Sequence, residues 1–423
     1  MTLIKTSLLN GTAVAIKMLT LLGINKVLAI YVGPAGYAAL GQFQNAIQMI
    51  TTFASGAVTT GVTKYTAEYH EDEEKQRAVW RTAGTISFIG SMLTGLLVIF
   101  FSKPLAGWFL KDESYSGVFV WFAVTLVFFV LNTLLLAILN GKKEIQRYVI
   151  ANIAGSLFAL LVTSIMAIKY GLYGVLVALA VYQSLAFFAT LLLCYKASWF
   201  KLSYIIGGVD KKSAKNLAKY TAMALTSAAC VPISHILVRN HLGETLGWEA
   251  AGYWEAMWRL SAAYLMLVTT TLSVYYLPRL SELKEAVAIK REILQGYKII
   301  LPVAAACGLS IYLLRDYIIR TLFTVDFASM QVLFAWQTVG DIFKIGSWII
   351  AYLMLAKAMV KTFIVSEVVF ASSFYIFTVI FTGGFQLQGV AIAYALNYMI
   401  YWSVMAFFLK FYSGGLSFND SPK

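Results

Sequence analysis

Charge is scarce in this sequence. Only 13% of its 423 residues are Asp, Glu, Lys or Arg, while 60% are hydrophobic and the mean hydropathy is +0.75. About one residue in four is charged in a typical soluble domain, so the composition excludes a water-soluble globular protein. Long apolar runs recur along the whole chain, and the polar intervals between them are too short to form a soluble domain. We therefore predict an all-α, polytopic membrane protein.

Residues that usually carry chemistry are also few. The cysteines lie inside predicted helices without metal-ligand spacing, which favours packing over metal binding: Cys194, Cys230 and Cys307. No phosphate-binding G-x-x-x-x-G-K-[ST] loop occurs, because "GAVTTGVT" at Gly56–Thr63 lacks the lysine. His235 and His241 have no evident nucleophile or metal partner in the sequence. These features argue against an enzyme, against an ATP-driven transporter and against a bound metal or cofactor.

Apolar runs of about 18 to 30 residues predict twelve transmembrane helices. They cover residues 7–32, 38–66, 82–102, 117–140, 147–169, 173–195, 218–239, 249–277, 297–314, 331–356, 361–382 and 387–411. An even number of spans places the two termini on the same side of the membrane.

Lysine and arginine are unevenly divided between the two sets of loops. One set carries most of them, mainly in clusters at 64–81, 142–147, 196–219 and 279–298. The other set has only Lys103, Lys111, Lys169, Arg239, Arg315 and Arg320. Cytoplasmic loops are enriched in these residues, so both termini are predicted to be cytoplasmic in a bacterial inner membrane. Contact with anionic lipid accounts for the basic loops and the net charge of +13, without any nucleic acid partner.

Two short matches indicate an internal repeat. "AGY" occurs at Ala35–Tyr37 and at Ala251–Tyr253, an offset of 216, and "GVLVALAV" from Gly174 resembles "GVAIAYAL" from Gly389, an offset of 215. An offset of six helices preserves orientation, which predicts two parallel-repeat lobes about an axis along the membrane normal. The predicted organisation is an N-terminal six-helix lobe at 1–195, a basic cytoplasmic linker at 196–217, a C-terminal six-helix lobe at 218–411 and a cytoplasmic tail at 412–423.

Ionisable residues inside the spans mark candidate sites, because each is costly in hydrocarbon. Glu255 and Arg259 are spaced i,i+4, and Asp341 and Lys344 are spaced i,i+3, so each pair can neutralise itself along one helix face. Glu367 has no cation at i+3 or i+4 and is either a proton site or a partner of Lys344. We regard the three acids as candidates for charge balance or proton coupling.

The first span carries Lys17 and Lys26 but no acidic residue. Nine residues turn a helix by about 900°, so the two lysines would face opposite sides of a straight helix. Gly23 lies between them and is a candidate hinge, because a bend there would bring both lysines toward one side. The alternative for Lys26 is that it snorkels to the outer interface. Pro232, in the seventh span, is the corresponding hinge candidate because it removes a backbone donor.

A polar stripe is predicted along the second span. Its members follow helical spacing: Gln44, Gln48, Thr51, Ser55 and Thr59. The stripe is either a hydrogen-bonding seam between helices or one wall of a wet path. Together with Lys17 it favours a central cationic cavity, in which an unpaired cation would bind an anion such as phosphate. The candidate substrate-binding residues are Lys17, Lys26, Arg259, Gln44, Gln48 and Lys344.

The lysine-bearing first helix, the turn "YVGPAGYAALGQF" at Tyr31–Phe43 and the polar second helix together resemble the Wzx-type polysaccharide flippases. These belong to the superfamily that also holds the multidrug and toxic-compound extruders and the lipid II flippase. The resemblance covers the whole chain and is greatest to the branch that moves lipid III of enterobacterial common antigen. The lipid II branch has two additional helices and uses arginines in its cavity, where this chain offers lysines.

The resemblance implies a substrate of undecaprenyl pyrophosphate bearing a short oligosaccharide with an acidic sugar. It also implies transfer from the cytoplasmic to the periplasmic leaflet by alternating access, with the polymerase and chain-length proteins of the pathway as partners. Coupling to a proton or sodium gradient is compatible with the buried acids. Two alternatives remain. A multidrug antiporter of the same superfamily would place carboxylates, not lysines, in its first lobe. A membrane polymerase or ligase would present a larger periplasmic loop than any seen here.

Overall fold

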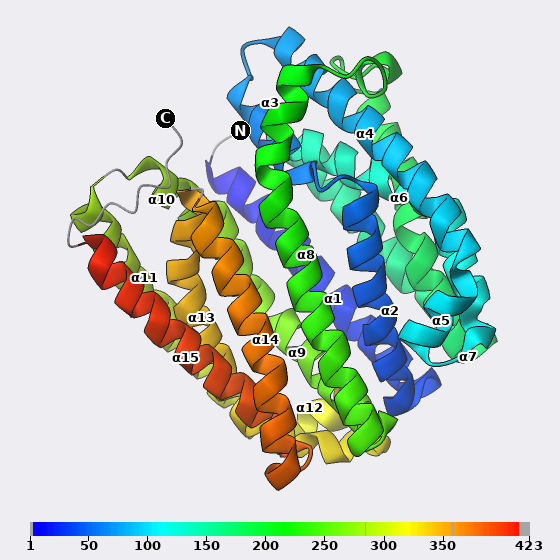
Figure 1. The fold of residues 1–423 in the computed structure, drawn as a ribbon, viewed down its shortest axis with the longest axis vertical. Coiled ribbons are helices and arrows are strands. Elements are labelled where there is room, and N and C mark those ends of the chain that lie inside the picture. Colours follow the sequence, from blue (N-terminus) through cyan, green and yellow to red (C-terminus); the bar gives the residue numbers. More distant parts are fainter. Residues whose placement is uncertain (1–2, 284, 358, 414–423) are drawn as a thin grey trace. The chain divides into compact units, whose positions relative to one another are not determined.

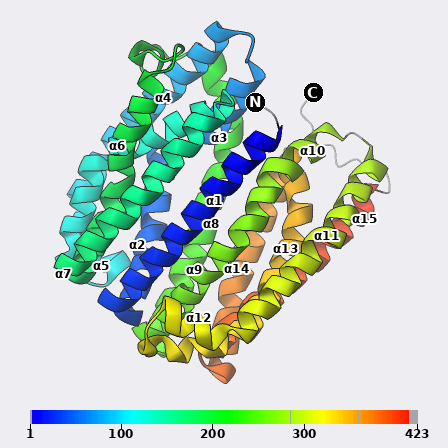
Figure 2. The same cartoon turned by 180° about the vertical axis from the view of Figure 1, so that it is seen from behind.

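The structure is a computed structural model that describes residues 3–283, 285–357 and 359–413. All regular elements within these ranges are helical (Figures 1 and 2). The chain divides into two compact units, which are Met1–Val32 with Ala39–Pro232 (unit 1) and Gly33–Ala38 with Ile233–Lys423 (unit 2). The all-α class is therefore confirmed. Most of the expected tail at 412–423 lies outside the described residues.

Unit 1 is a bundle built around α6 and α7. Its helices are α1 (Leu3–Tyr31), most of α2 (Gly33–Ala54), α3 (Thr59–Glu68), α4 (Glu73–Phe100), α5 (Ser102–Leu110), α6 (Ser116–Gly141), α7 (Ile145–Tyr195) and the first part of α8 (Lys211–Thr245), with 3-10 turns at Glu113–Tyr115 and Leu202–Tyr204. α6 packs against both α4 and α7, and α7 packs against α1 (Figure 2). A Cβ added at Gly95 of α4 would meet the carbonyl of Ala123 at 3.1 Å, so this small residue lets α4 and α6 approach closely.

The second predicted span is interrupted in the structure. One helix was expected over 38–66, but α2 ends at Ala54 and α3 begins at Thr59. Gly56 and Ala57 in the turn have φ of +62° and +52°, a left-handed conformation that ends the helix. No proline marks this break, so the apolar periodicity continued through it. The expected stripe of five polar residues therefore does not lie on a single helix.

α7 contains two predicted spans in one element. It is 51 residues long, and Gly171 within it has φ 54° and ψ −136°, which no helical residue adopts. A continuous helix of this length would measure about 75 Å, more than twice the hydrocarbon thickness of a bilayer. The break falls between the spans expected at 147–169 and 173–195, which confirms their separation.

The expected linker at 196–217 is folded onto unit 1. The indole nitrogen of Trp199 donates to Oε1 of Glu144 at 2.6 Å. The carbonyl of Ile205 lies so close to Gly84 of α4 that a Cβ there would be 1.8 Å from it. Trp199, Ile205 and Leu217 are buried in one apolar cluster with Trp80. The segment is thus a packed part of this unit, while the predicted lobe boundaries stay a prediction.

Unit 2 is organised around α13. It holds the end of α8, α9 (Trp248–Thr271), a π-helical turn at Leu272–Tyr276, α10 (Leu277–Glu282), α11 (Ala286–Leu313), α12 (Arg315–Leu322), a 3-10 segment at Val325–Leu333, α13 (Phe334–Ala356), α14 (Val360–Phe385) and α15 (Gln388–Ser413). α13 packs against α11 and α15, and α15 packs against α14 (Figure 1). Ile289, Ile349 and Leu353 are fully buried at the centre of this packing.

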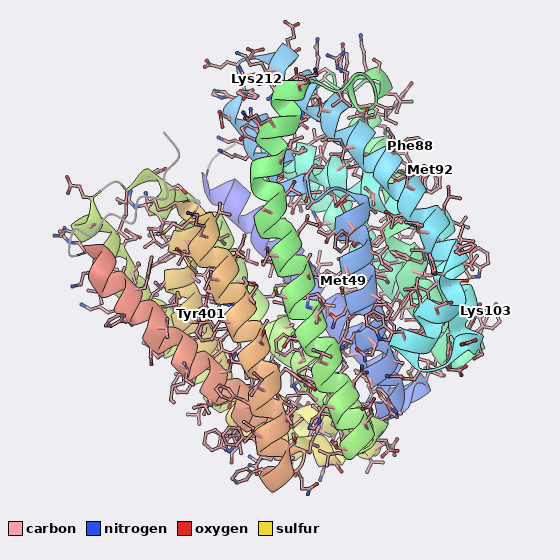
Figure 3. All side chains as sticks on the ribbon, in the orientation of Figure 1. Met49, Phe88, Met92, Lys103, Lys212 and Tyr401 are labelled. Atoms are coloured by element: carbon pink, nitrogen blue, oxygen red, sulfur yellow. The ribbon has the colours of Figure 1, made fainter. Side chains whose placement is uncertain are left out.

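Long apolar helices make this a multi-pass membrane protein. Within the described residues, 8 helices are long and apolar enough to cross a bilayer, and one of them is the two-span Ile145–Tyr195. α2, α8 and α9 coincide with predicted spans but are not among these 8. The count of twelve is compatible with this arrangement. Figure 3 shows Lys212 near the top of unit 1 and Lys103 lower down at its right-hand edge, and the sides of the membrane assigned to the loops stay a prediction.

Candidate functional site

The two copies of the "AGY" motif lie against each other in unit 2. The first turn of α2 belongs to this unit and packs on the first turns of α9. A Cβ added at Gly252 would be 1.7 Å from the carbonyl oxygen of Pro34, so the two backbones touch. The rings of Tyr37 and Tyr253 both contact Phe327, with centroids 5.1 and 6.1 Å away. The repeat seen in the sequence is therefore also a packing contact.

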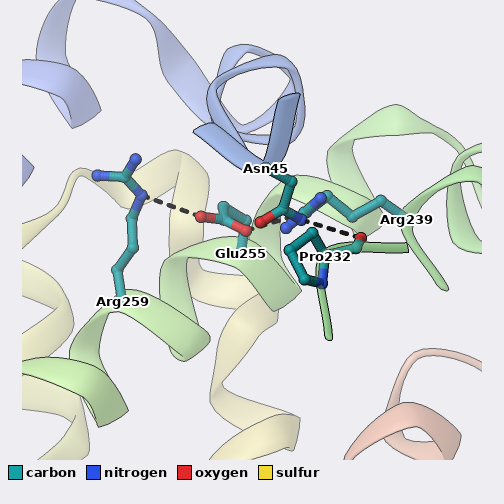
Figure 4. A network of polar contacts seen from close by, with 5 residues as sticks. All are labelled: Asn45, Pro232, Arg239, Glu255 and Arg259. Atoms are coloured by element: carbon teal, nitrogen blue, oxygen red, sulfur yellow. Dashed lines mark hydrogen bonds and ion pairs between the residues drawn. The ribbon is translucent and has the colours of Figure 1, made fainter. Parts of the chain in front are cut away.

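A buried chain of charges crosses from α8 to α9 (Figure 4). Nε of Arg239 donates to Oε2 of Glu255 at 3.0 Å, and Nε of Arg259 donates to Oε1 of the same carboxylate at 3.1 Å. The side chains of Arg239 and Glu255 are 2% and 3% exposed, and that of Arg259 is 11% exposed. The i,i+4 pair expected from the sequence thus forms, and a second arginine joins it.

This chain of charges is not neutral. Two guanidinium groups share one carboxylate, which leaves one net positive charge in a buried place. Arg259 lies with its guanidinium carbon 5.7 Å from the ring centre of Tyr37, and its Nη2 has no hydrogen-bond partner among the described residues. The indole nitrogen of Trp254, on the same helix, also lacks one. A buried donor without an acceptor is costly, so the arrangement is suited to receive an anionic or oxygen-rich group.

Hydroxyl groups make the direct contacts to the carboxylate of Asp341. Oδ2 accepts hydrogen bonds from Ser261 at 2.8 Å and from Tyr264, and Oδ1 accepts one from Tyr394 at 2.6 Å. No ion pair joins Asp341 to Lys344 within the described residues. Lys344 still acts on this carboxylate through its charge, so the three O–H donors from α9 and α15 stabilise Asp341 in addition to its i,i+3 neighbour, and the expected neutralisation stays a prediction.

Lys344 sits among aromatic rings. Its side chain is buried, and Nζ lies 4.3, 4.8, 5.5 and 5.3 Å from the ring centres of Trp258, Trp348, Tyr394 and Tyr398. Cation–π attraction stabilises an ammonium in such a place by about 0.5–2 kcal/mol per favourable ring. Because Tyr394 both faces Lys344 and donates to Asp341, these two charges belong to one network in unit 2.

The other predicted site residues are distributed along several helices. Glu367 is half-buried on α14 in unit 2, near Tyr398 and Tyr401. Lys17, Lys26, Gln44 and Gln48 belong to unit 1. On α1, Lys17 is exposed and Lys26 is half-buried, and on α2, Gln44 is half-buried and Gln48 is exposed.

Hydroxyls of the expected stripe bond to their own helix. Thr51 donates to the carbonyl of Ile47 at 2.7 Å, and Ser55 donates to that of Thr52 at 3.1 Å. Back-bonded hydroxyls of this kind have already satisfied their donors, so they contribute less to a wet wall than the glutamines do.

Neither hinge candidate breaks its helix. α1 runs from Leu3 to Tyr31 with Gly23 inside it, where an added Cβ would be 3.4 Å from Leu160 of α7. α8 runs from Lys211 to Thr245 with Pro232 inside it. The carbonyl of Pro232 accepts a 3.4 Å hydrogen bond from Asn45, and the boundary between the two units falls directly after this proline. Their roles as hinges stay predictions.

Arg239 is a site residue that the sequence pattern does not indicate. The apolar run ends at this residue, which by sequence alone predicts an outer-loop position for it. The helix continues to Thr245, so Arg239 lies inside the packed unit and 16 residues before its partner Glu255. A buried acid with one local cation at i+4 carries no visible signal of a second cation on another helix. The described residues contain no group of three or more metal-binding side chains.

Two comparisons with known proteins find similar sequences over most of this chain. A profile described as polysaccharide biosynthesis protein matches residues 3–284. The Lipid III flippase of Escherichia coli (strain K12) is 31% identical over 404 residues, which cover 96% of this chain and 97% of that protein.

Solved structures share the fold. A multidrug MATE family transporter of the MOP superfamily, in an inward-facing conformation, matches with a TM-score of 0.76 at 15% identity over 96% of both chains. The lipid II flippase MurJ, in an inward closed conformation, matches with a TM-score of 0.74 at 15% identity over 96% of this chain and 87% of that one.

Proposed function

This chain belongs to the polysaccharide biosynthesis protein family, and from that membership we propose that it moves a lipid-linked oligosaccharide from one leaflet of a membrane to the other. The family match confirms the resemblance drawn from the sequence. The observation that carries the proposal is the 31% identity to a lipid III flippase over nearly the whole length of both chains. The proposed substrate is undecaprenyl pyrophosphate bearing a short oligosaccharide with an acidic sugar, as in lipid III. The activity makes and breaks no covalent bond.

The charges of unit 2 support an anionic substrate. A pyrophosphate head group carries several oxygen acceptors and more than one negative charge, and guanidinium groups bind phosphate oxygens with paired donors. The guanidinium of Arg259 is largely buried, and its Nη2 has no hydrogen-bond partner among the described residues. Its acidic partner Glu255 is shared with Arg239, so the charge of Arg259 is only partly neutralised. We assign Arg259 to the head group and propose Lys17, Lys26, Gln44, Gln48 and Lys344 as further substrate-binding residues.

The acids of the chain are assigned to charge balance or to ion coupling. Glu255 balances its arginines, while Asp341 and Glu367 lie on α13 and α14 of unit 2. A proton or sodium gradient is the proposed energy source, because the chain offers no nucleotide-binding loop. Both termini are proposed to lie on the cytoplasmic side of a bacterial inner membrane. Transfer is proposed to run from the cytoplasmic to the periplasmic leaflet by alternating access. The polymerase and chain-length proteins that use the flipped lipid are the proposed partners.

Reconstitution tests this proposal. The purified chain in proteoliposomes is given a fluorescent undecaprenyl-pyrophosphate oligosaccharide, and an impermeant glycosidase reports how much of it reaches the outer leaflet. We expect faster transfer than in protein-free vesicles, and a loss of about ten- to hundredfold with Arg259→Gln, from removal of a charge-assisted contact. Proton and sodium gradients imposed separately identify the coupling ion. Transfer no faster than in empty vesicles, with export of a cationic dye instead, would favour a multidrug antiporter.

A further inference from the structure

Arg239 stands apart from the other charged residues of unit 2. Its side chain is 2% exposed, and its guanidinium carbon lies 5.5 Å from the ring centre of Trp254. Its Nε is committed to Oε2 of Glu255. A guanidinium covered in this way does not reach a substrate, and its ion pair with Glu255 links it to Arg259.

The carboxylate of Glu255 is divided between two cations. Each oxygen accepts from one arginine, at 3.0 Å for Arg239 and 3.1 Å for Arg259 (Figure 4). Arg259 is spaced i,i+4 from the acid on α9, which by itself is a complete ion pair. Without the second arginine, the local pair would be neutral and Arg259 would have no excess charge for an anion. With it, the three side chains keep a charge of +1.

We propose that Arg239 is a positioning residue that occupies Glu255 and thereby keeps Arg259 electropositive for the head group of the substrate. This inference rests on the proposed function and assigns to Arg239 a part in it that differs from substrate contact. It also explains how an acid can lie beside an arginine that is proposed to bind phosphate, although the acid by itself would repel that group. Glu255 orients the guanidinium of Arg259 through Nε, while Arg239 offsets the charge of that acid.

The charge argument predicts an order among variants that a purely structural role does not. Arg239→Gln leaves Glu255 facing Arg259 alone, so the site becomes neutral and KM for the lipid-linked oligosaccharide should rise about tenfold or more, with a smaller change in kcat. Arg239→Gln combined with Glu255→Gln restores a charge of +1 on Arg259. The double variant should therefore recover a large part of the loss, even though it has lost two buried hydrogen bonds. Arg239→Lys keeps the charge and should stay closer to the wild type than Arg239→Gln.

The experiment measures KM and kcat for flipping of undecaprenyl-pyrophosphate oligosaccharide in proteoliposomes, with protein inserted and folded at equal levels. Lys103→Gln, which removes an exposed cation of unit 1, serves as the matched control and should leave both constants unchanged. Rescue in the double variant supports the inference. A double variant as impaired as Arg239→Gln, or an Arg239→Gln protein with the wild-type KM, overturns it.

Folding failure of the glutamine variant does not block the test. Replacement of a buried ion pair by apolar residues of similar volume is often neutral or stabilising, so Arg239→Met with Glu255→Met is the second route. That protein retains the charge of Arg259 and should have a KM within a few fold of Arg239→Lys. A KM ten times higher would refute the charge argument. If the wild-type protein itself transfers no lipid-linked oligosaccharide, the proposed function fails, which is distinct from failure of this inference.

Discussion

Gly252→Ala tests the contact that joins the two halves of the "AGY" repeat. The new Cβ would lie 1.7 Å from the carbonyl oxygen of Pro34, 2.4 Å from its carbonyl carbon and 3.2 Å from its Cα. All three neighbours are backbone atoms, so no side chain can rotate away to make room. The first turn of α2 would have to shift away from α9, and Tyr37 in that turn would lose part of its packing on Phe327.

The size of the effect follows from two opposing terms. Overpacking of a well-packed interior costs about 1–3 kcal/mol, and contacts with backbone place this site at the upper end. Alanine is favoured over glycine inside a helix by about 1 kcal/mol, which offsets part of that cost. We therefore expect Gly252→Ala to lower the free energy of unfolding by about 2 kcal/mol. It should also weaken substrate transport, since Tyr37 faces the guanidinium of Arg259.

The assay is thermal unfolding in detergent micelles, followed by tryptophan fluorescence, together with flipping in proteoliposomes. Gly308→Ala is the matched control. This glycine is also inside a helix of unit 2 and is buried, but its nearest neighbour, Cβ of Thr338, would be 3.6 Å from the new methyl group. Gly308→Ala should be neutral or stabilising by up to about 1 kcal/mol. Equal melting temperatures for Gly252→Ala and the wild type would refute the close contact between the two "AGY" segments.

Four further predictions address single residues. Pro232→Ala adds a backbone donor to α8, so it should raise the melting temperature and slow flipping; unchanged flipping in a more stable protein would remove the hinge role. Lys344→Met keeps the volume inside the aromatic cage but removes its cation–π contacts, so stability should fall by about 1–2 kcal/mol and transport should fall as well; wild-type transport would show that the charge is not used. Lys17→Glu should impair flipping more than Lys17→Ala at equal folded protein, since a carboxylate repels the head group; equal activity of folded Lys17→Glu and wild type would mean that this charge binds no substrate. Hydrogen bonds from the side chain and backbone of Ser213 lower the pKa of Asp210. This carboxylate therefore stabilises the folded state above its unfolded pKa near 4 and loses that effect as pH falls through the folded pKa. The melting temperatures of Asp210→Ala and wild type should differ at pH 7 and converge as pH falls below about 4, and a constant difference across that range would contradict the assignment.

Several features of this protein follow from local sequence alone. The helical class, the membrane location and the position of most spans depend on the mean hydropathy of about 20 neighbouring residues. That mean does not depend on how the helices pack, so the sequence alone determines it. The Glu255–Arg259 pair was also predictable, because i,i+4 spacing on a helix brings the two side chains together whatever packs around them. The break at Gly171 was visible as a gap between two apolar runs, because one span is limited by bilayer thickness.

Other features were decided by tertiary packing. The turn at Gly56 was hidden because a left-handed glycine leaves no mark in hydropathy, and the segment at 196–217 proved to be folded because Trp199, Ile205 and Leu217 find an apolar cluster built from distant helices. The i,i+3 spacing of Asp341 and Lys344 did not indicate their direct contacts, which are hydroxyls from two other helices for the acid and aromatic rings for the lysine. Arg239 reaches Glu255 across a helix boundary for the same reason. A buried charge is stabilised by whichever groups the fold brings within about 3–5 Å, and that set depends on how separate helices pack, which spacing along one helix does not specify.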